Sequence, residues 1–83
     1  MGHQILHTHA WRLFRAKLVA EWRSQPEVRC HLCQRTLGPS DVISVDHLQP
    51  LVRRPDLAFD RTNCLPACLR CNSAKKDRGR RQW

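Results

Sequence analysis

The chain has 83 residues, and its 15 Lys and Arg exceed its 7 Asp and Glu to give a formal net charge of +8. This length allows one small domain, excludes a large multi-layer enzyme, and leaves an apolar core that gives only thin stability. No apolar run is long enough for a membrane span or a signal peptide, so we expect no membrane partner and a reducing, cytoplasmic location. The positive charge favours a polyanionic partner, and nucleic acid is the first candidate.

The first predicted element is an N-terminal helix from about Thr8 to Gln25. Its apolar residues recur at helical spacing and form one stripe that should face the core: Trp11, Phe14, Leu18 and Trp22. Thr8 suits the N-cap position, and Pro26 should end the helix. The basic residues of this helix fit either a solvated face or a DNA-facing one. We expect solvated side chains, rather than a second metal site, at the histidines near its start: His3, His7 and His9.

Four of the five cysteines form two CxxC pairs. Two thiolates on a tight turn can face one ion, and a second pair completes a tetrahedron. The spacing therefore predicts a structural zinc ion bound by Cys30, Cys33, Cys68 and Cys71, which would also supply stability that the small core lacks. An odd number of cysteines and the lack of an apparent signal peptide disfavour a disulfide framework. We expect the fifth, Cys64, to be a small buried hydrophobe, and His31, inside the first pair, to face solvent or DNA.

The segments between the cysteine pairs predict short strands and a loop. Residues 28–30 should form a strand that enters the first CxxC turn. Residues 42–48 are rich in β-branched side chains, which predicts a second strand. Residues 49–61 contain two prolines and no periodicity, so we expect a loop with at most one short helical turn.

The last predicted element is a helix from Cys71 to about Arg78, ended by Gly79 and followed by a loose basic tail. Residues 63–67 should lead into the second CxxC turn. We therefore expect one domain over residues 1–83, with these parts: an N-terminal helical region (1–26), a zinc-bound core (28–78) and a basic tail (79–83).

Residues suited to metal binding and proton transfer lie between and after the cysteine pairs: Asp46, His47, Asn63 and Asn72. Asp46 and the Asn72 carbonyl are hard oxygen ligands that suit a Mg²⁺ ion completed by water and substrate phosphate. His47 should point to the opposite face of its strand from Asp46, and beside a phosphate it could take a proton from water. An isolated Asp-His pair is more often structural than catalytic, so the functional interpretation rests on the joint arrangement.

This joint arrangement closely resembles the HNH endonuclease family in its zinc-bound form. The matching segments are Cys30-x-x-Cys33, Val45-Asp46-His47-Leu48-x-Pro50-Leu51, Asn63, and Cys68-x-x-Cys71-Asn72-x-x-Lys75. The resemblance covers about residues 28–76. It implies a small α+β, ββα-metal fold in which two strands and a helix hold one catalytic Mg²⁺ or Mn²⁺ beside the structural zinc.

The resemblance also implies roles for single residues in a DNA endonuclease that hydrolyses phosphodiester bonds. His47 would be the general base, Asp46 and Asn72 would bind the catalytic ion, and Asn63 would brace the loop that positions His47. Arg70 and Lys75 match positions that are usually basic in the family. The clustered basic residues that we expect to contact phosphates of double-stranded DNA are Arg53, Arg54, Arg70, Lys75, Lys76 and Arg78. Small members of this kind resemble phage nucleases, so packaging machinery is a candidate protein partner.

The chain departs from the family pattern at three places. Asn72 stands where many members have His, which makes this an HNN variant and favours Mg²⁺ or Mn²⁺ over softer metals. Arg-Arg-Pro-Asp at residues 53–56 replaces a frequent Gly-Gly, so the loop should differ in shape. Cys64 stands where Leu is common, which fits a buried side chain. None of these departures removes a catalytic group.

Two other interpretations stay open. A non-catalytic zinc-stabilised nucleic-acid-binding module would explain the charge and the cysteine pairs. It would leave the joint presence of the polar residues unexplained: Asp46, His47, Asn63 and Asn72. A protein-interaction adaptor has only the Trp-bearing N-terminal helix in its favour.

Overall fold

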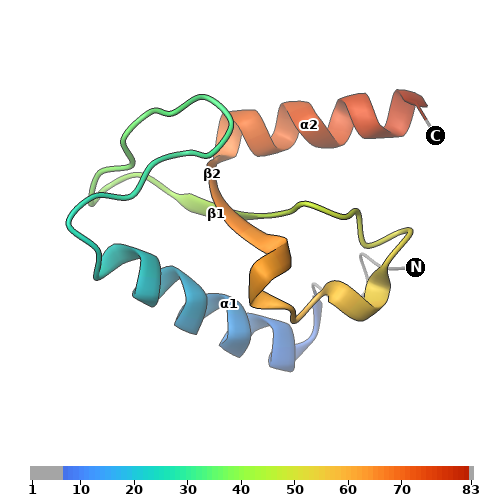
Figure 1. Cartoon of the computed structure of the whole chain (residues 1–83), viewed down its shortest axis with the longest axis horizontal. Helices are drawn as coiled ribbons and strands as arrows, with labels where there is room; N and C mark the ends of the chain where they lie inside the picture. The colour runs from blue at the N-terminus through green and yellow to red at the C-terminus, as the bar shows by residue number, and fades with distance from the viewer. Residues whose placement is uncertain (1–6, 83) are drawn as a thin grey trace.

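The computed structural model describes residues 7–82, with side chains through residue 75. The elements in chain order are α1 (His9–Arg23), β1 (Ile43–His47), two short 3₁₀ turns (Pro55–Leu57 and Arg61–Asn63), β2 (Cys64–Cys68) and α2 (Leu69–Gln82). The two strands form an antiparallel sheet, and the two helices lie on opposite sides of it (Figure 1). The predicted small α+β class is confirmed, with strand, strand and helix following an N-terminal helix.

Helix α1 begins where the sequence predicts. The Thr8 hydroxyl accepts a hydrogen bond from the Trp11 amide at 3.1 Å, which satisfies a donor that has no partner within the helix. Trp11 and Leu18 are buried, as the apolar stripe predicts, while His7 and His9 are exposed and His3 lies outside the described residues. The helix ends at Arg23 rather than near Gln25, and the Gln25 amide donates to the Trp22 carbonyl, three residues earlier, instead of continuing the helical pattern.

Two arginines of α1 are used inside the fold. Arg15 donates to the carbonyl of Ile43 at 3.1 Å, and Arg23 donates to the carbonyls of Gly38 and Asp41 at 3.2 and 2.6 Å. These carbonyls lie in and just before β1, so the arginines tie the segment that enters the strand to the helix. An ion pair between Arg61 and Glu21 ties α1 to the second 3₁₀ turn in the same way. Charge on α1 therefore contributes to tertiary structure, which the sequence left undecided.

The register of the sheet places Asp46 opposite Leu65 and His47 opposite Cys64. β1 falls within the predicted strand, but the sequence did not predict β2 as a strand because Pro66 lies at its centre. Proline is tolerated there because the sheet has only two strands, and each strand is an edge. The strand predicted at residues 28–30 is wrong: only an isolated bridge between Arg29 and Thr36 forms.

Helix α2 corrects the prediction of a helix ended by Gly79 and a loose tail. The helix starts at Leu69 and continues through Gly79 to Gln82. A glycine in a helix interior costs about 1 kcal/mol relative to alanine, so Gly79 weakens α2 without ending it. Neither helix within the described residues is long and apolar enough to cross a membrane.

The core is divided between two ends of the sheet. At one end, aliphatic side chains pack around two cysteines: Val28, Cys30, Leu37, Ile43, Ala67 and Cys68. At the other end, aromatic rings gather beside the last residue of β1, with Trp11 contacting Phe14, Phe59 and His47 at centroid separations of 5.6, 6.0 and 5.2 Å. The first cluster surrounds sulfur atoms and the second supports an imidazole, so each end positions a different set of polar groups.

Candidate metal centre and hydrolytic site

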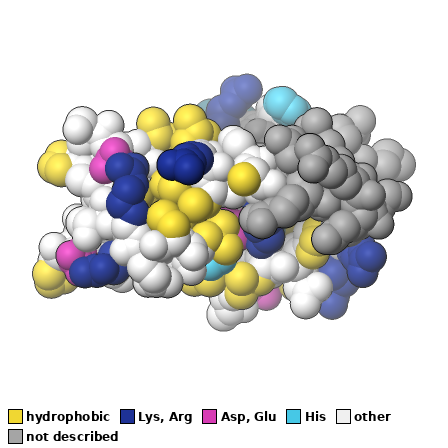
Figure 2. Space-filling view, turned by 90° about the horizontal axis from the view of Figure 1, so that it is seen from above, with side chains coloured by type: hydrophobic (Ala, Val, Ile, Leu, Met, Phe, Trp, Pro, Cys, Tyr) yellow, Lys and Arg dark blue, Asp and Glu magenta, His cyan; other side chains and the backbone are white. Residues whose placement is uncertain are grey.

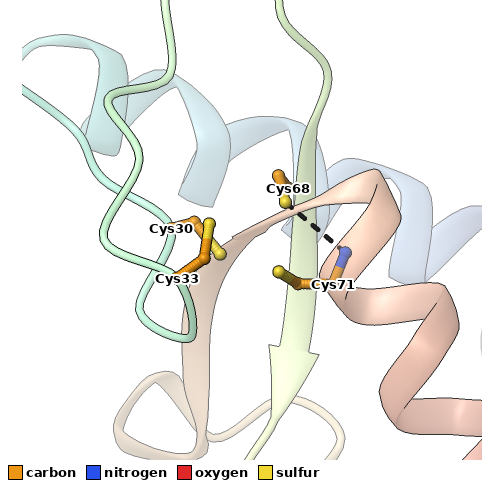
Figure 3. A group of neighbouring side chains, drawn as sticks. All are labelled: Cys30, Cys33, Cys68 and Cys71. Carbon is orange, nitrogen blue, oxygen red and sulfur yellow. Dashed lines mark hydrogen bonds between the residues drawn. The ribbon is translucent and has the colours of Figure 1, made fainter.

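The four CxxC cysteines come together in space, and we call them the four-cysteine cluster: Cys30, Cys33, Cys68 and Cys71. Their sulfur atoms all lie within 4.8 Å of one another, and the side chains point toward a common centre (Figure 3). Tetrahedral zinc with Zn–S bonds of about 2.3 Å needs sulfur separations of about 3.8 Å. The arrangement therefore fits a structural zinc ion.

The first pair of ligands sits on a tight turn, and the second pair spans the end of β2 and the first turn of α2. Gln34, directly after the first pair, has a φ of 66° and returns its amide to the carbonyl of Cys30 at 2.8 Å. The amide of Cys71 likewise donates to the Cys68 sulfur at 3.4 Å (Figure 3). The first bond closes the turn that holds Cys30 and Cys33, and the second stabilises negative charge on the Cys68 sulfur.

The electrostatics of the four-cysteine cluster favour a bound cation. Burial opposes ionisation of Cys30, but amides of Cys68, Cys33 and Leu32 outweigh it and lower the pKa of the thiol to about 6. Hydrogen bonding to the thiols of Cys68 and Cys33 raises the pKa of Cys71 to about 12. The sulfurs therefore cannot all ionise on their own, and a divalent cation would supply the missing compensation.

Cys64 does not belong to this cluster. It is buried in β2, and its thiol donates to the carbonyl of Asp60 at 3.3 Å. Burial, followed by the charge of Asp60, raises the pKa of the Cys64 thiol to about 11. A buried, neutral thiol is what the sequence predicts, and that prediction is confirmed.

At the other end of β1, Asp46 and His47 project to different neighbours, as alternation along a strand requires. The His47 Nε2 atom lies 3.1 Å from the carbonyl oxygen of Ala58, so the ring N–H donates to that oxygen. Trp11 packs beside the ring. A carbonyl partner and an aromatic neighbour together fix the orientation and the protonated nitrogen of the imidazole.

Asp46 is 5 % exposed and faces the first CxxC turn and α2. Its Oδ2 atom accepts from His31 Nε2 at 2.6 Å and from Lys75 Nζ at 2.9 Å. The expectation that His31 faces solvent or DNA is therefore wrong. The backbone explains the error, because the His31 amide donates to the Pro66 carbonyl at 2.9 Å and holds this turn against β2.

Asn72 lies on the face of α2 that packs against β1. It is 6 % exposed, and its Nδ2 atom donates to the carbonyl of Val45 at 3.4 Å. Lys75, about one helical turn later, reaches Asp46 and also the carbonyl of His47 at 3.4 Å. The structure thus brings Asp46 and Asn72 to one contact between β1 and α2, and we call Asp46, His47 and Asn72 the β1–α2 site.

The donor set of the β1–α2 site fits a hard divalent cation. A buried carboxylate and a carboxamide supply oxygen atoms, and among the described residues no donor contacts the Asn72 Oδ1 atom. The Lys75 ammonium lies against the Asp46 carboxylate and the His47 carbonyl, so positive charge is already favourable at this position. Too few protein ligands for a closed cage leave room for water and substrate.

Comparison with protein-family models decides the family. The model of the HNH endonuclease family matches residues 30–78, more than half of the chain. The chain belongs to the HNH endonuclease family. No curated protein and no solved structure gives a significant match to it. Membership of the HNH family supports a nuclease-type function and nucleic-acid binding in general terms.

Asn63 braces the loop that follows β1. Its Oδ1 atom accepts from the Gln49 amide at 2.7 Å, and its Nδ2 atom donates to the carbonyls of Gln49 and Leu57 at 3.3 and 3.4 Å. Its own carbonyl accepts from the Leu48 amide at 2.9 Å. These bonds hold the two residues directly after His47, which is the geometry that a bracing role needs.

The loop after β1 closes at the residues where the resemblance led us to expect a glycine pair. The amides of Arg53 and Arg54 both donate to the Pro50 carbonyl, at 3.0 and 2.9 Å, which closes a turn without glycine. The first 3₁₀ turn follows directly and brings Ala58 to His47. Sequence reasoning missed Ala58 because a backbone acceptor leaves no signal in residue type.

The six basic residues that we expect to contact DNA phosphates differ in exposure and in their partners. Arg53, Arg54 and Arg70 are exposed, and Arg54 pairs with Asp56 at 2.9 Å. Lys75 is half-buried on Asp46, and the side chains of Lys76 and Arg78 lie outside the described residues. Figure 2 shows Lys and Arg side chains at separate places on the face seen from above, some with acidic side chains directly beside them.

Proposed function

We propose that this chain is a metal-dependent DNA endonuclease that hydrolyses phosphodiester bonds, with His47 as general base. One observation carries the proposal. An imidazole with a fixed ring orientation ends β1 directly beside a buried carboxylate, and a buried carboxamide of α2 contacts the same strand end. These groups lie within the segment that matches the HNH family.

The geometry of His47 suits proton removal. Because its Nε2–H donates to the Ala58 carbonyl, the neutral ring carries its lone pair at Nδ1. A neutral imidazole near physiological pH can take a proton from the attacking water as the new P–O bond forms. The carbonyl also stabilises the imidazolium that results, because a hydrogen bond from a charged N–H donor is stronger than one from a neutral donor.

Asp46 and Asn72 would hold the catalytic Mg²⁺ or Mn²⁺ ion. When bound, that ion supplies charge stabilisation for the phosphate and for the leaving oxygen. Asp46 contributes the full negative charge, and Asn72 contributes a neutral oxygen, a combination that hard cations accept. The four-cysteine cluster would hold a separate structural zinc ion and have no part in the reaction.

The substrate that we propose is double-stranded DNA, held through phosphates by exposed arginines such as Arg53 and Arg70. One such site cuts one strand, so a double-strand break would need a second copy, a second visit or a partner. We further propose that residues 1–83 act as one nuclease domain in the cytoplasm, with packaging machinery as a candidate partner.

The test is nicking of supercoiled plasmid by the zinc-loaded full chain with Mg²⁺ or Mn²⁺. We expect His47→Ala to lower the nicking rate at least about 100-fold, the usual loss for a general base. His9→Ala is the matched control, because His9 is exposed at the start of α1. Equal nicking by wild type and His47→Ala, or no nicking by either, would contradict the proposal.

The same experiment separates the second candidate, a non-catalytic nucleic-acid-binding module. That candidate is favoured by the contacts of Asp46, whose Oδ2 atom already bonds to His31 and Lys75. It predicts that the chain retards DNA in a binding assay but leaves plasmid intact with either metal. Metal-dependent nicking that requires His47 would exclude it.

A further inference from the structure

His31 reaches from the first CxxC turn into the β1–α2 site. Its Nε2 atom lies 2.6 Å from Asp46 Oδ2, and the side chains of the two residues are 19 % and 6 % exposed. The motifs of the sequence give His31 no role. Cys30 and Cys33, on either side of it, belong to the four-cysteine cluster. The function proposed above does not use this imidazole.

The backbone holds His31 firmly in this place. Its amide donates to the Pro66 carbonyl at 2.9 Å, and Pro66 is the register partner of Val45, the residue before Asp46. Its own carbonyl accepts from the Gln34 side chain at 3.1 Å. The imidazole therefore projects toward Asp46 from a turn whose backbone is bonded to β2, and not from a freely rotating surface residue.

We propose that His31 is a third protein ligand of the divalent-ion site, together with Asp46 and Asn72. This inference rests on the site of the proposed function and adds a nitrogen ligand to it. His47 has a different part in the proposed function, because the lone pair at its Nδ1 atom would take the proton from water while its Nε2–H donates to Ala58. The imidazole within reach of the Asp46 carboxylate is that of His31.

The separation of the two groups suits joint metal binding. Two ligands in adjacent positions of an octahedral site with bonds of about 2.1 Å lie about 3 Å apart. His31 Nε2 and Asp46 Oδ2 need to spread by only a few tenths of an ångström from 2.6 Å to reach that value. To bind the ion through Nε2, the neutral imidazole would carry its one ring proton on Nδ1, so the ion would take the place of the N–H between the two groups.

Lys75 indicates where positive charge is favoured beside this pair. Its ammonium lies 2.9 Å from the same Asp46 oxygen and 3.4 Å from the His47 carbonyl. The side chain is 35 % exposed, so it can move toward solvent or a phosphate when an ion binds. A cation held by His31 and Asp46 would replace the attraction that Lys75 now provides.

A nitrogen ligand changes the expected metal preference. Mg²⁺ prefers oxygen ligands almost exclusively, whereas Mn²⁺ accepts imidazole more readily. We therefore expect the site to bind Mn²⁺ more tightly than Mg²⁺. Removal of the imidazole should make the affinities for the two ions more similar. The first CxxC turn would then contribute ligands to both metal sites.

The test is pulsed electron paramagnetic resonance of Mn²⁺ bound to the zinc-loaded full chain. The His47→Ala background is used, so that a nitrogen coupling cannot come from His47. We expect a ¹⁴N coupling that is lost in His31→Ala and His31→Gln and kept in His9→Ala. Glutamine keeps an N–H that can donate to Asp46 but lacks the imidazole nitrogen. His31→Gln therefore distinguishes a metal ligand from a residue that only forms a hydrogen bond to Asp46.

Titration calorimetry in the same background should show Mn²⁺ binding at least about tenfold weaker in both His31 variants, since even outer-shell partners contribute that much. Zinc content and circular dichroism identify any variant that fails to fold, and His31→Gln then replaces His31→Ala. A ¹⁴N coupling that persists in His31→Gln, no coupling in the His47→Ala background, or no Mn²⁺ binding would overturn the proposal.

The outcomes for the two proposals are distinct. His47-dependent nicking by a protein without the His31 coupling would overturn the ligand role and keep the proposed endonuclease. A His31-dependent coupling in a protein that never nicks DNA would support the metal site and overturn the endonuclease.

Discussion

The four-cysteine cluster and the β1–α2 site share the first two turns of α2, but they differ in ligand chemistry and in assembly. The cluster consists of four sulfur ligands on two tight turns, and neighbours along the chain set most of its geometry. The β1–α2 site has hard ligands from a strand and a helix, with Lys75 and His31 against its carboxylate. The first arrangement suits permanent binding that holds the fold, and the second suits an ion and a substrate that come and go.

The largest expected effect comes from breaking the cluster. Cys68→Ser should remove zinc and unfold the chain, because structural zinc supplies about 10–16 kcal/mol in small domains. Zinc analysis and circular dichroism at 25 °C would measure both losses. Cys64→Ala is the matched control and should retain zinc, because Cys64 lies outside the cluster. Full zinc content and an unchanged melting temperature in Cys68→Ser would refute the metal assignment.

A substitution in the loop after β1, away from the four-cysteine cluster, should destabilise the chain without releasing zinc. Asn63→Ala removes three side-chain hydrogen bonds of a buried residue and leaves the Gln49 amide without its acceptor. We expect a loss of about 2–3 kcal/mol in the free energy of unfolding, measured by urea titration of the zinc-loaded protein. Thr62→Ala, an exposed neighbour, should lose less than about 1 kcal/mol. Zinc release by Asn63→Ala would show that the two ends are not separable.

Cys64 offers a smaller, pH-dependent comparison between a buried thiol and the metal-binding ones. Burial raises the pKa of its thiol from 9.0 to about 11 in the folded chain. The unfolded chain therefore releases this proton first as pH rises above 9, and stability falls until the folded thiol also ionises. Urea titrations at pH 8 and 11 should show wild type losing about 2 kcal/mol more than Cys64→Ala. An equal loss in both proteins would contradict the buried, neutral thiol.

The smallest expected effect is on DNA binding, and it concerns two exposed arginines. Arg70 has no acidic partner among the described residues, whereas Arg54 pairs with Asp56. If both contact phosphate, Arg70→Ala should weaken DNA binding a few-fold and reduce the slope of log K against log salt by about 1. Arg54→Ala should change the slope less, because Asp56 already offsets its charge. Equal slopes for wild type and Arg70→Ala would remove Arg70 from the interface.

The parts of the fold that sequence could predict are those set by neighbours along the chain. The Thr8 cap and the apolar stripe on α1 depend on residues within a few positions of one another, and both appear as expected. The cluster likewise follows from CxxC spacing. β2 was missed because Pro66 is a poor strand residue, and only the two-stranded sheet makes it acceptable.

The parts of the site that could not be predicted depend on contacts between distant segments. Residue types indicated Asp46 and Asn72, but nothing local shows that His31 bonds to Asp46 rather than to solvent. That contact requires the His31 amide to pair with Pro66, 35 residues later. The carbonyl that orients His47 is also a backbone group, whose identity as Ala58 carries no chemical signal.

The immediate succession of Cys71 and Asn72 limits how this chain can change in length. An inserted residue between them would turn the rest of α2 by about 100° relative to the cluster. Asn72 would then leave the Val45 carbonyl and Lys75 would leave Asp46, although all four sulfurs could still meet. The number of residues along α2 thus sets the rotation of the β1–α2 site about the helix axis relative to the four-cysteine cluster. The fold should tolerate an insertion between Cys71 and Asn72, but the β1–α2 site should not.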